Sequence, residues 1–393
     1  MATDFVPLQG VRVVDVTSSL AGPYCTEILG ALGADVIKVE HPERGDEARA
    51  WGPPFWAGSS VLFYAANLNK RSLALDLKRG RDILLRLVDT ASVFLQSLRP
   101  GTAQRLGFDA AELRRRNPQL VYCDIGAFGR VGPLRELPGY DPLLQAFGGL
   151  ISVTGEADRP GVRVGASVVD QGTGTWAALG ILAALIEGGG RTVDVSLFES
   201  VVALLPYHVT AYLASGEIPA RHGTAFPLIA PYQVFRARDG ELMIAAANDG
   251  LFKRLCDALD LRELAVDPRF ATNPDRLRRR EELAALIEER LRDESVEDVL
   301  RRVEGAGVPA ARVNDVGQVA DHPQTAALGL IQKVPEPTVA LPLSFDGDRI
   351  SHRRPPPRLG EHTREILTEL RYGSDEIERL QAEGIVEGVQ SSP

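Results

Sequence analysis

Hydrophobic residues follow two alternating patterns through the first half of the chain. Short runs rich in β-branched residues have the composition of buried parallel strands, and between them apolar residues recur at helical spacing. The first pattern predicts strands at 11–16, 35–40, 72–77, 92–98, 119–125 and 191–197. The second predicts helices near 25–33, 79–90, 110–117 and 176–186, and a long apolar helix over 198–215. Strands that alternate with helices predict an α/β sheet covered on both faces.

The pattern changes after Gly216. Two strand-like runs, 232–237 and 241–247, flank Arg238-Asp239-Gly240, which is a hairpin signal. We predict a second, smaller α+β unit that begins here. Its remaining elements are charged amphipathic helices over 251–304, and they are followed by strand-like sequence at 308–313 and 335–342 and by helices near 361–370 and 375–383.

Composition narrows the classes of function. A chain of 393 residues is long enough for two domains. Its net charge of −9 argues against a nucleic-acid partner, and the basic runs at 114–116 and 276–280 are diluted by neighbouring Glu and Asp. No apolar run reaches the ~18 residues of a membrane span, and the N-terminus lacks the features of a signal peptide. Cys25, Cys123 and Cys256 lie far apart, which indicates free thiols in a reducing compartment and no zinc site, so we expect a cytoplasmic protein without a metal or membrane partner.

The first strand, helix and second strand form a βαβ unit like the one that opens Rossmann dinucleotide-binding folds. The glycine fingerprint is missing, however, because the turn contains Ala21-Gly22-Pro23 and a proline has no N–H for a pyrophosphate. NAD and FAD are therefore not favoured. The helix N-terminus still attracts anions, so Ser18 to Ala21 is a candidate contact for the phosphates or adenine of a ligand.

One carboxylate has an unusual sequence context. Asp170 lies between an apolar run, 143–153, and Gly172-Thr173-Gly174, which open the predicted helix. It has two interpretations, a helix N-cap and a functional acid, and on residue type alone the cap is the commoner. Both can hold, since a cap also fixes the orientation of an acid. A second candidate is Asn67 to Arg71, where two amides and two cations before a strand fit either a phosphate contact or a solvated turn.

Eight stretches, in order along the chain, resemble the family III CoA-transferases. This is the CaiB/BaiF family, which includes formyl-CoA transferases and is related to the α-methylacyl-CoA racemases. The resembling stretches are LQGVRVVDVTSSLAGPYCTEILGALGADVIKVE, NLNKRSLALDL, RPGTAQRLGF, GYDPLLQAFGGLISVTG, VVDQGTG, RTVDVSLFES, RHGTAFPLIAPYQVFRARDG and PRLGEHTREIL.

The resemblance implies an architecture. It predicts a Rossmann-like large domain formed by both chain ends, a smaller α+β domain between them, and an interlocked homodimer. We accordingly expect the first part of the large domain at 1–197, a linker helix at 198–225, the small domain at 226–320, and a return to the large domain at 321–393.

The resemblance also implies that Asp170 is the nucleophile. A carboxylate can attack an acyl-CoA thioester, and a covalent intermediate splits one difficult exchange into easier steps. Backbone N–H groups at Gly172 to Gly174 are then expected to stabilise the developing oxyanions. Acyl-CoA and a carboxylic acid are substrates in this scheme, and no tightly bound cofactor is implied.

The CoA contacts that the resemblance implies form a longer set. His41 stands where relatives often carry an arginine, so its contact with phosphate is expected to be weaker or pH-dependent. The set is Ser18, Ser19, Leu20, Ala21, His41, Asn69, Lys70, Arg71, Ser97, Leu98, Arg105 and Tyr140.

Two other functions remain as alternatives. Racemases of this fold pair the aspartate with a His in a GHD motif, whereas this chain has Gly139-Tyr140-Asp141, and a phenol with a pKa near ~10 is a poor base. A CoA-binding protein without catalysis is disfavoured by the intact Asp170 motif. The resemblance to the family suggests small dicarboxylates as substrates. Arg221 and Arg236 are candidates for pairing with the carboxylate of such a substrate that lies away from the thioester.

Overall fold

The computed structural model describes residues 5–56 and 58–388, and the chain divides into two compact units. Unit 1 comprises Met1–Leu150, Arg163–Ser215 and Pro323–Pro393, so it contains both chain ends. Unit 2 comprises Ile151–Val162 and Gly216–His322. The segment 198–225, expected as one linker helix, is therefore shared between the two units.

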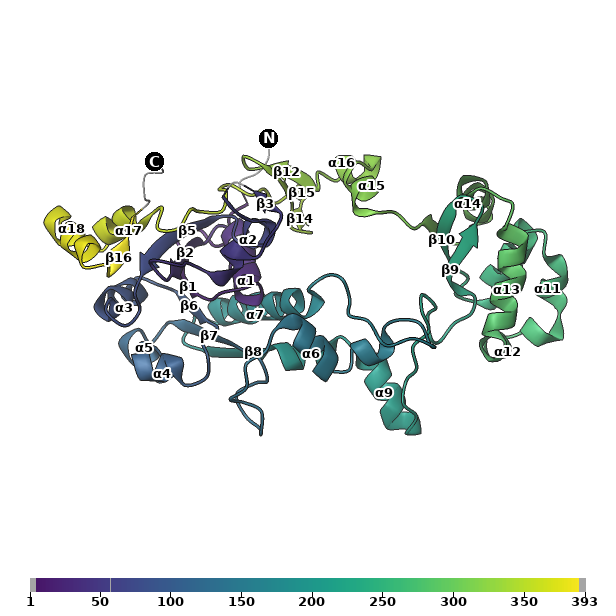
Figure 1. The fold of residues 1–393 in the computed structure, drawn as a ribbon, viewed down its shortest axis with the longest axis horizontal. Helices are drawn as coiled ribbons and strands as arrows, with labels where there is room; N and C mark the ends of the chain where they lie inside the picture. The colour runs from purple at the N-terminus through teal and green to yellow at the C-terminus, as the bar shows by residue number, and fades with distance from the viewer. Residues whose placement is uncertain (1–4, 57, 389–393) are drawn as a thin grey trace. The chain divides into compact units, whose positions relative to one another are not determined.

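A seven-stranded sheet forms the centre of unit 1 (Figure 1). All of its strands are parallel except β16, which pairs antiparallel with β5. The register of β1 with β2 runs from Arg12 opposite Asp35 to Asp15 opposite Lys38. The predicted mostly parallel α/β sheet is thereby confirmed, and only the two-residue β16 was not anticipated. The strands, in spatial order, are β16 (Val386–Glu387), β5 (Lys70–Leu75), β2 (Asp35–Glu40), β1 (Arg12–Val16), β6 (Val93–Gln96), β7 (Val121–Gly126) and β8 (Thr192–Ser196).

Helices cover both faces of this sheet (Figure 1). Successive strand residues point to opposite faces, so Val13 and Val14 contribute to two separate apolar cores. One core is closed by α1 (Ala21–Ala31) and α7 (Val168–Ile186). The other is closed by α3 (Arg81–Asp89), α5 (Ala110–Arg116) and α17 (Thr363–Glu369).

Helices α1 and α7 approach each other through a glycine. A Cβ atom on Gly174 would lie 2.5 Å from the carbonyl oxygen of Ala21, so any other residue there would force the helices apart. This contact brings the first turn of α7, which carries Asp170, beside the start of α1.

The order of the strands reverses between β1 and β6. From β1 the chain continues to β2 and β5 on one side of the sheet, and then crosses to β6, β7 and β8 on the other. In open parallel sheets, ligands bind beyond the carboxyl ends of the strands at such a reversal. The residues that follow β1 and β6 are therefore in the expected place for a ligand.

The apolar helix predicted over 198–215 is wrong as a single helix. The segment forms α8 (Leu197–Ala203) and α9 (Pro206–Ser215), which are bent by 70° relative to each other. Pro206 accounts for the break, because its ring clashes with a preceding helical turn and it lacks an N–H. Within the described residues no single helix is long and apolar enough to cross a membrane, and this bent pair meets that test only when both helices are taken together.

Unit 2 contains a three-stranded antiparallel sheet of β9 (Tyr232–Ala237), β10 (Gly240–Ala245) and β11 (Ala310–Arg312). Gly240 pairs with Ala237, so Arg238 and Asp239 form the turn and the predicted hairpin is confirmed. Apolar residues of this sheet pack on the helices α10 (Asp249–Ala258), α13 (Arg280–Leu291) and α14 (Val296–Gly305).

The remaining elements are short. In unit 1 they are η1 (Glu47–Ala50), β3 (Phe55–Trp56), β4 (Ser59–Ser60), α2 (Val61–Ala66), α4 (Thr102–Leu106), α6 (Asp141–Phe147), α16 (Pro323–Ala327), β12 (Ile331–Lys333), β13 (Pro337–Val339), β14 (Ser344–Phe345), β15 (Asp348–Arg349) and α18 (Ser374–Ala382). In unit 2 they are η2 (Ile151–Val153), α11 (Arg262–Val266), η3 (Pro268–Phe270), α12 (Asn273–Arg278) and α15 (Val316–Ala320).

Candidate active site

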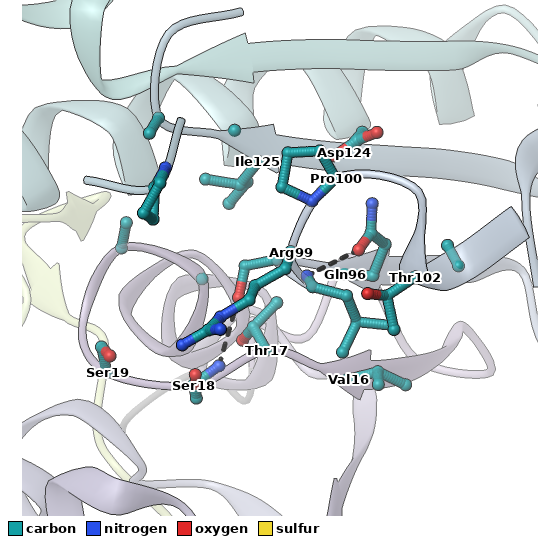
Figure 2. Close-up of a pocket in the computed structure, with 18 of the residues that line it drawn as sticks. Val16, Thr17, Ser18, Ser19, Gln96, Arg99, Pro100, Thr102, Asp124 and Ile125 are labelled. Carbon is teal, nitrogen blue, oxygen red and sulfur yellow. Dashed lines mark hydrogen bonds between the residues drawn. The ribbon is translucent and has the colours of Figure 1, made fainter. Parts of the chain in front are cut away.

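A cavity of about 2240 Å³ lies in unit 1 beyond the carboxyl ends of the parallel strands (Figure 2). It is larger than the ~300–1,000 Å³ typical of drug-sized ligands, and so has room for a long one. The predicted site residues that line it are Ser18, Ser19, Ala21, His41, Ser97, Leu98, Tyr140 and Asp170. The predicted residues that do not line it are Leu20, Asn69, Lys70, Arg71 and Arg105.

The loops after β1 and β6 meet at the point where the strand order reverses. The Ser18 N–H donates a hydrogen bond to Ser97 Oγ at 3.3 Å. On the other side of the loop, the Ser19 N–H donates to Asp46 Oδ1 at 3.0 Å. Ser19 has a φ of +69°, a left-handed conformation that is uncommon for residues other than glycine. The loop at the reversal point is thus held in one unusual conformation.

Asp170 lies in the first turn of α7 and not at the N-cap position that the cap interpretation gave it. The N-cap residue is Ser167, so the interpretation of Asp170 as the N-cap is wrong. Asp141 satisfies the first donors of the helix instead, because its Oδ2 accepts from the N–H groups of Val169 at 2.8 Å and Asp170 at 3.1 Å. Asp141 is buried, whereas Asp170 is partly exposed and lines the cavity.

Burial and, to a smaller extent, the nearby Asp141 carboxylate together raise the pKa of Asp170 to about 7. A helix N-terminus would ordinarily favour the charged form of an acid. Here the first N–H groups of α7 are already bonded to Asp141, which leaves less of that stabilisation for Asp170. The result is an accessible carboxyl group that changes its protonation state near neutral pH, a property found often in catalytic acids and nucleophiles.

The oxyanion donors predicted at Gly172 to Gly174 are wrong. These residues lie inside α7, where their N–H groups bond to carbonyl oxygens one turn earlier. The start of α1 offers an alternative. Its N-cap residue, Leu20, has no polar side chain, so the N–H groups of Ala21 and Gly22 begin α1 without a side-chain cap, and both residues line the cavity.

The phosphate contact predicted at Asn69, Lys70 and Arg71 is replaced by structural roles. Lys70 and Arg71 lie in β5, and Lys70 is fully buried with its Nζ 3.3 Å from Asp15 Oδ2. Arg71 pairs with Asp35 and with two carboxylates of α17. Asn69 is bonded to the ring of His352 at 3.0 Å. Arg105 is exposed and donates to Thr102 Oγ1 at 2.7 Å.

Three cationic side chains at the cavity were not singled out from the sequence. Arg44 follows β2, Lys78 follows β5 and Arg99 follows β6, and all three line the cavity. Among the lining residues in 5–56 and 58–388, they are the lysine and arginine side chains that form neither an ion pair nor a hydrogen bond with protein. Figure 2 shows Arg99 extending toward Ser18. Their position just beyond the carboxyl ends of predicted strands was the signal that could have identified them.

Tyr140 forms part of the cavity wall. It is 52% exposed, so it is not a core tyrosine. Its hydroxyl donates to Glu47 Oε1 at 3.2 Å, and Ser19 Oγ donates to the same oxygen at 2.9 Å. Partial burial and the Glu47 carboxylate both raise the pKa of Tyr140, which makes the phenol a still poorer base at neutral pH. Trp51 lies against its ring, with the centroids 6.2 Å apart.

The two arginines considered for a distal carboxylate are used elsewhere. Both belong to unit 2 and neither lines the cavity. Arg221 donates to the carbonyl oxygens of Glu156 at 3.1 Å and Arg159 at 2.8 Å, and Arg236 lies 3.5 Å from Glu241. Within the part of the chain that the structure describes, no three His, Cys, Asp or Glu side chains are grouped so as to hold a metal ion.

Known proteins resemble the whole chain. The family model of CoA-transferase family III matches residues 8–363. The chain is 38% identical to the succinyl-CoA:glutarate CoA-transferase of Mus musculus, over 97% of this chain and 90% of the relative. It is 39% identical to the acetyl-CoA:oxalate CoA-transferase of Acetobacter aceti, over 90% and 93% respectively. The crystal structure of a CAIB/BAIF family protein from Brucella suis superposes with a TM-score of 0.84 at 40% identity, and covers 93% of this chain and 100% of that one.

We predict that Asp141→Asn lowers the pKa of Asp170 by about one unit, because it removes the neighbouring negative charge but keeps an oxygen to accept from the helix. Carbon-13 NMR of labelled aspartate carboxyl groups against pH would measure this, with Asp170→Asn to assign the signal. Burial is the larger cause, so the pKa is expected to stay above that of a free aspartate. An unchanged pKa would show that Asp141 does not act electrostatically on Asp170.

Proposed function

The chain belongs to CoA-transferase family III and is a CoA-transferase, and from this premise we propose that Asp170 carries CoA from an acyl-CoA thioester to a free carboxylic acid. The observation that carries the proposal is a partly exposed carboxyl group at the cavity, fixed in the first turn of α7 by the Asp141 cap, with a pKa raised to about 7 by burial.

The proposed reaction proceeds in two exchanges at one carboxyl group. An Asp170 oxygen attacks the thioester carbonyl carbon, the C–S bond breaks, and CoA leaves as a thiolate from a mixed anhydride. The thiolate then attacks the aspartyl carbonyl carbon, which releases the first acid as a carboxylate and leaves an aspartyl-CoA thioester. The second acid reverses both steps, so Asp170 is regenerated and no proton, metal or redox partner is consumed.

The environment of Asp170 suits this chemistry. Partial desolvation makes its carboxylate a stronger nucleophile than one in water, at the cost of requiring deprotonation near neutral pH. The developing oxyanion needs donors in place before the reaction. We assign that role to the N–H groups of Ala21 and Gly22, because α1 begins at the cavity and packs against α7 at Gly174, one turn after Asp170.

CoA is proposed to bind along the carboxyl edge of the sheet. Its phosphates require cations, and Arg44, Lys78 and Arg99 are the unpaired cations of the cavity wall. Ser18, Ser19, Ser97 and Leu98 at the strand reversal then face the rest of the molecule. His41, which follows β2 beside Arg44, remains a proposed secondary contact.

We propose small dicarboxylic acids as donor or acceptor. The support is the names of relatives, which include enzymes acting on succinyl-CoA with glutarate, D-citramalate or mesaconate. A racemase function is less well supported, because Tyr140 stands where a base is needed and its pKa is raised.

We also propose that two chains form a homodimer, as the family resemblance implied. Helix α9 has no buried residue and exposes Tyr207, Val209, Tyr212 and Leu213, an apolar surface of the kind that subunit contacts cover. Sedimentation equilibrium should give twice the chain mass of 42.5 kDa. A mass of one chain at micromolar concentration would contradict the dimer.

The nucleophile can be tested by intact-mass spectrometry with succinyl-CoA. The wild-type chain should gain a hydroxylamine-labile CoA adduct, and Asp170→Asn should form none and lose transfer by on the order of 10³-fold or more. Because the carboxylate is the reactive form, the rate at low donor concentration should rise with pH up to about 7 and then level off. Asp124→Asn is the matched control, since Asp124 also lines the cavity and has a pKa raised to about 6 by burial.

Either of two results would contradict this assignment. One is an adduct that survives in Asp170→Asn, and the other is exchange of the α-proton of 2-methylacyl-CoA in heavy water without any adduct. The second result would favour the racemase.

The proposed phosphate contacts predict an effect on affinity. Lys78→Met and Arg99→Met should each weaken CoA binding about tenfold and reduce its dependence on salt, because each removes one charge–phosphate contact. Arg115→Met is the control, since Arg115 lines the cavity but already pairs with Glu112 at 3.0 Å. Calorimetric titration of CoA at low and high salt would measure this, and equal affinities for all three variants would contradict the assignment.

A further inference from the structure

Four buried charges lie beneath the loop that follows β1. Asp15, Lys38 and Lys70 have no exposed surface, and Asp46 is 4% exposed. Lys38 Nζ lies 2.8 Å from Asp46 Oδ2, and Lys70 Nζ lies 3.3 Å from Asp15 Oδ2. We call these four residues the buried tetrad. With two cations and two anions it carries no net charge.

The tetrad bonds directly to the loop 17–19. Lys38 Nζ donates to the carbonyl oxygen of Thr17 at 3.0 Å, and Asp15 Oδ1 accepts from the Thr17 N–H at 2.9 Å. Asp46 Oδ1 accepts from the N–H of Ser19 at 3.0 Å. Three of the four charges therefore hold the backbone of Thr17 and Ser19 from below, while Ser18 and Ser19 face the cavity.

Stability alone does not account for this arrangement. The free energy lost by desolvating a buried ion pair is about as large as the free energy gained from its attraction. A protein with an apolar pair of similar size in its place is therefore often at least as stable. The tetrad does, however, fix a loop that would not keep its conformation unaided. Ser19 has a φ of +69°, and strained backbone of this kind persists only where the surrounding structure holds it, most often at functional sites.

We propose that Lys38 and Asp46 are positioning residues, which hold the loop 17–19 in the conformation that binds the CoA thioester. This inference rests on the proposed function, because it takes the loop at the strand reversal to be the CoA-binding loop. The residues act through Thr17 and Ser19, because Lys38 does not line the cavity and Asp46, which does, is only 4% exposed. A pre-ordered loop binds more tightly, because the cost of ordering it is not taken from the binding energy.

The proposal predicts a loss of affinity for the CoA thioester without a change in the rate of the chemical step. Asp170 is held by α7 and by Asp141, whereas the bonds of Lys38 and Asp46 described above go to the loop 17–19. Loosening the loop should therefore raise KM and leave kcat nearly unchanged, which is the pattern expected when binding common to ground state and transition state is lost.

The test removes both members of the Lys38–Asp46 ion pair together. Lys38→Met/Asp46→Leu replaces both charges with apolar side chains, so no unpaired charge stays buried and the chain should fold with a melting temperature near that of the wild type. We expect the Kd for CoA and the KM for succinyl-CoA to rise about tenfold, with kcat within about threefold of the wild type.

Two further variants distinguish positioning from a general structural effect. Lys38→Met/Asp46→Asn keeps an oxygen that can accept from the Ser19 N–H, so it should recover most of the affinity without the charge. Arg12→Met/Glu369→Leu removes an ion pair of 2.8 Å at the amino end of β1, outside the cavity, and should leave the Kd unchanged.

The outcomes are separable. Wild-type Kd and KM in a folded Lys38→Met/Asp46→Leu protein would overturn the positioning role, as would an equal loss of affinity in the Arg12→Met/Glu369→Leu control. If the wild-type chain itself neither binds CoA nor forms an adduct, the proposed function fails and this inference fails with it. Loss of affinity in the Leu variant, its recovery in the Asn variant and a constant kcat would establish the role.

Discussion

The parallel strands of unit 1 all end at the same edge of the sheet, and this constraint places every group of the candidate site. The loops after β1, β2, β5 and β6 are brought together there, although they are far apart in sequence. Parallel strands require helical crossovers, and the crossovers that cover one face also bring α1 and α7 into contact through Gly174. The Asp170 carboxyl group, the start of α1 and the cations Arg44, Lys78 and Arg99 thus share one cavity because of the topology.

Asp141 and Asp170 divide two tasks that one residue seldom performs alone. Asp141 gives its carboxylate to the first N–H groups of α7, so the helix is capped and the carboxyl group of Asp170 is left for chemistry. The same proximity, together with burial, raises the pKa of Asp170 to about 7. For the proposed nucleophile, a pKa near neutral pH combines high basicity with a substantial ionised fraction.

The position of a basic residue relative to the end of its strand decides its role here. Lys70 and Arg71 lie within β5, so their side chains are surrounded by protein and are paired with acids. Lys78 lies just beyond the end of the same strand and faces the cavity without a partner. Lys70 and Arg71 therefore stabilise the fold, whereas Lys78, a few residues later and of the same charge, is available to a ligand.

The sequence by itself determined the alternation of strands and helices and the smaller second unit, because these depend on local periodicity, and a short motif singled out Asp170 as a candidate. It did not determine which side chain caps α7, since Asp141 lies 28 residues before Val169 along the chain and no local pattern links the two. It also misassigned Lys70 and Arg71, because charge in a sequence does not say that an acid lies on the adjacent strand, as Asp35 does, or on the strand beyond it, as Asp15 does. Which polar groups are consumed by the fold and which are left for a substrate is a property of long-range packing, and only the tertiary structure decided it.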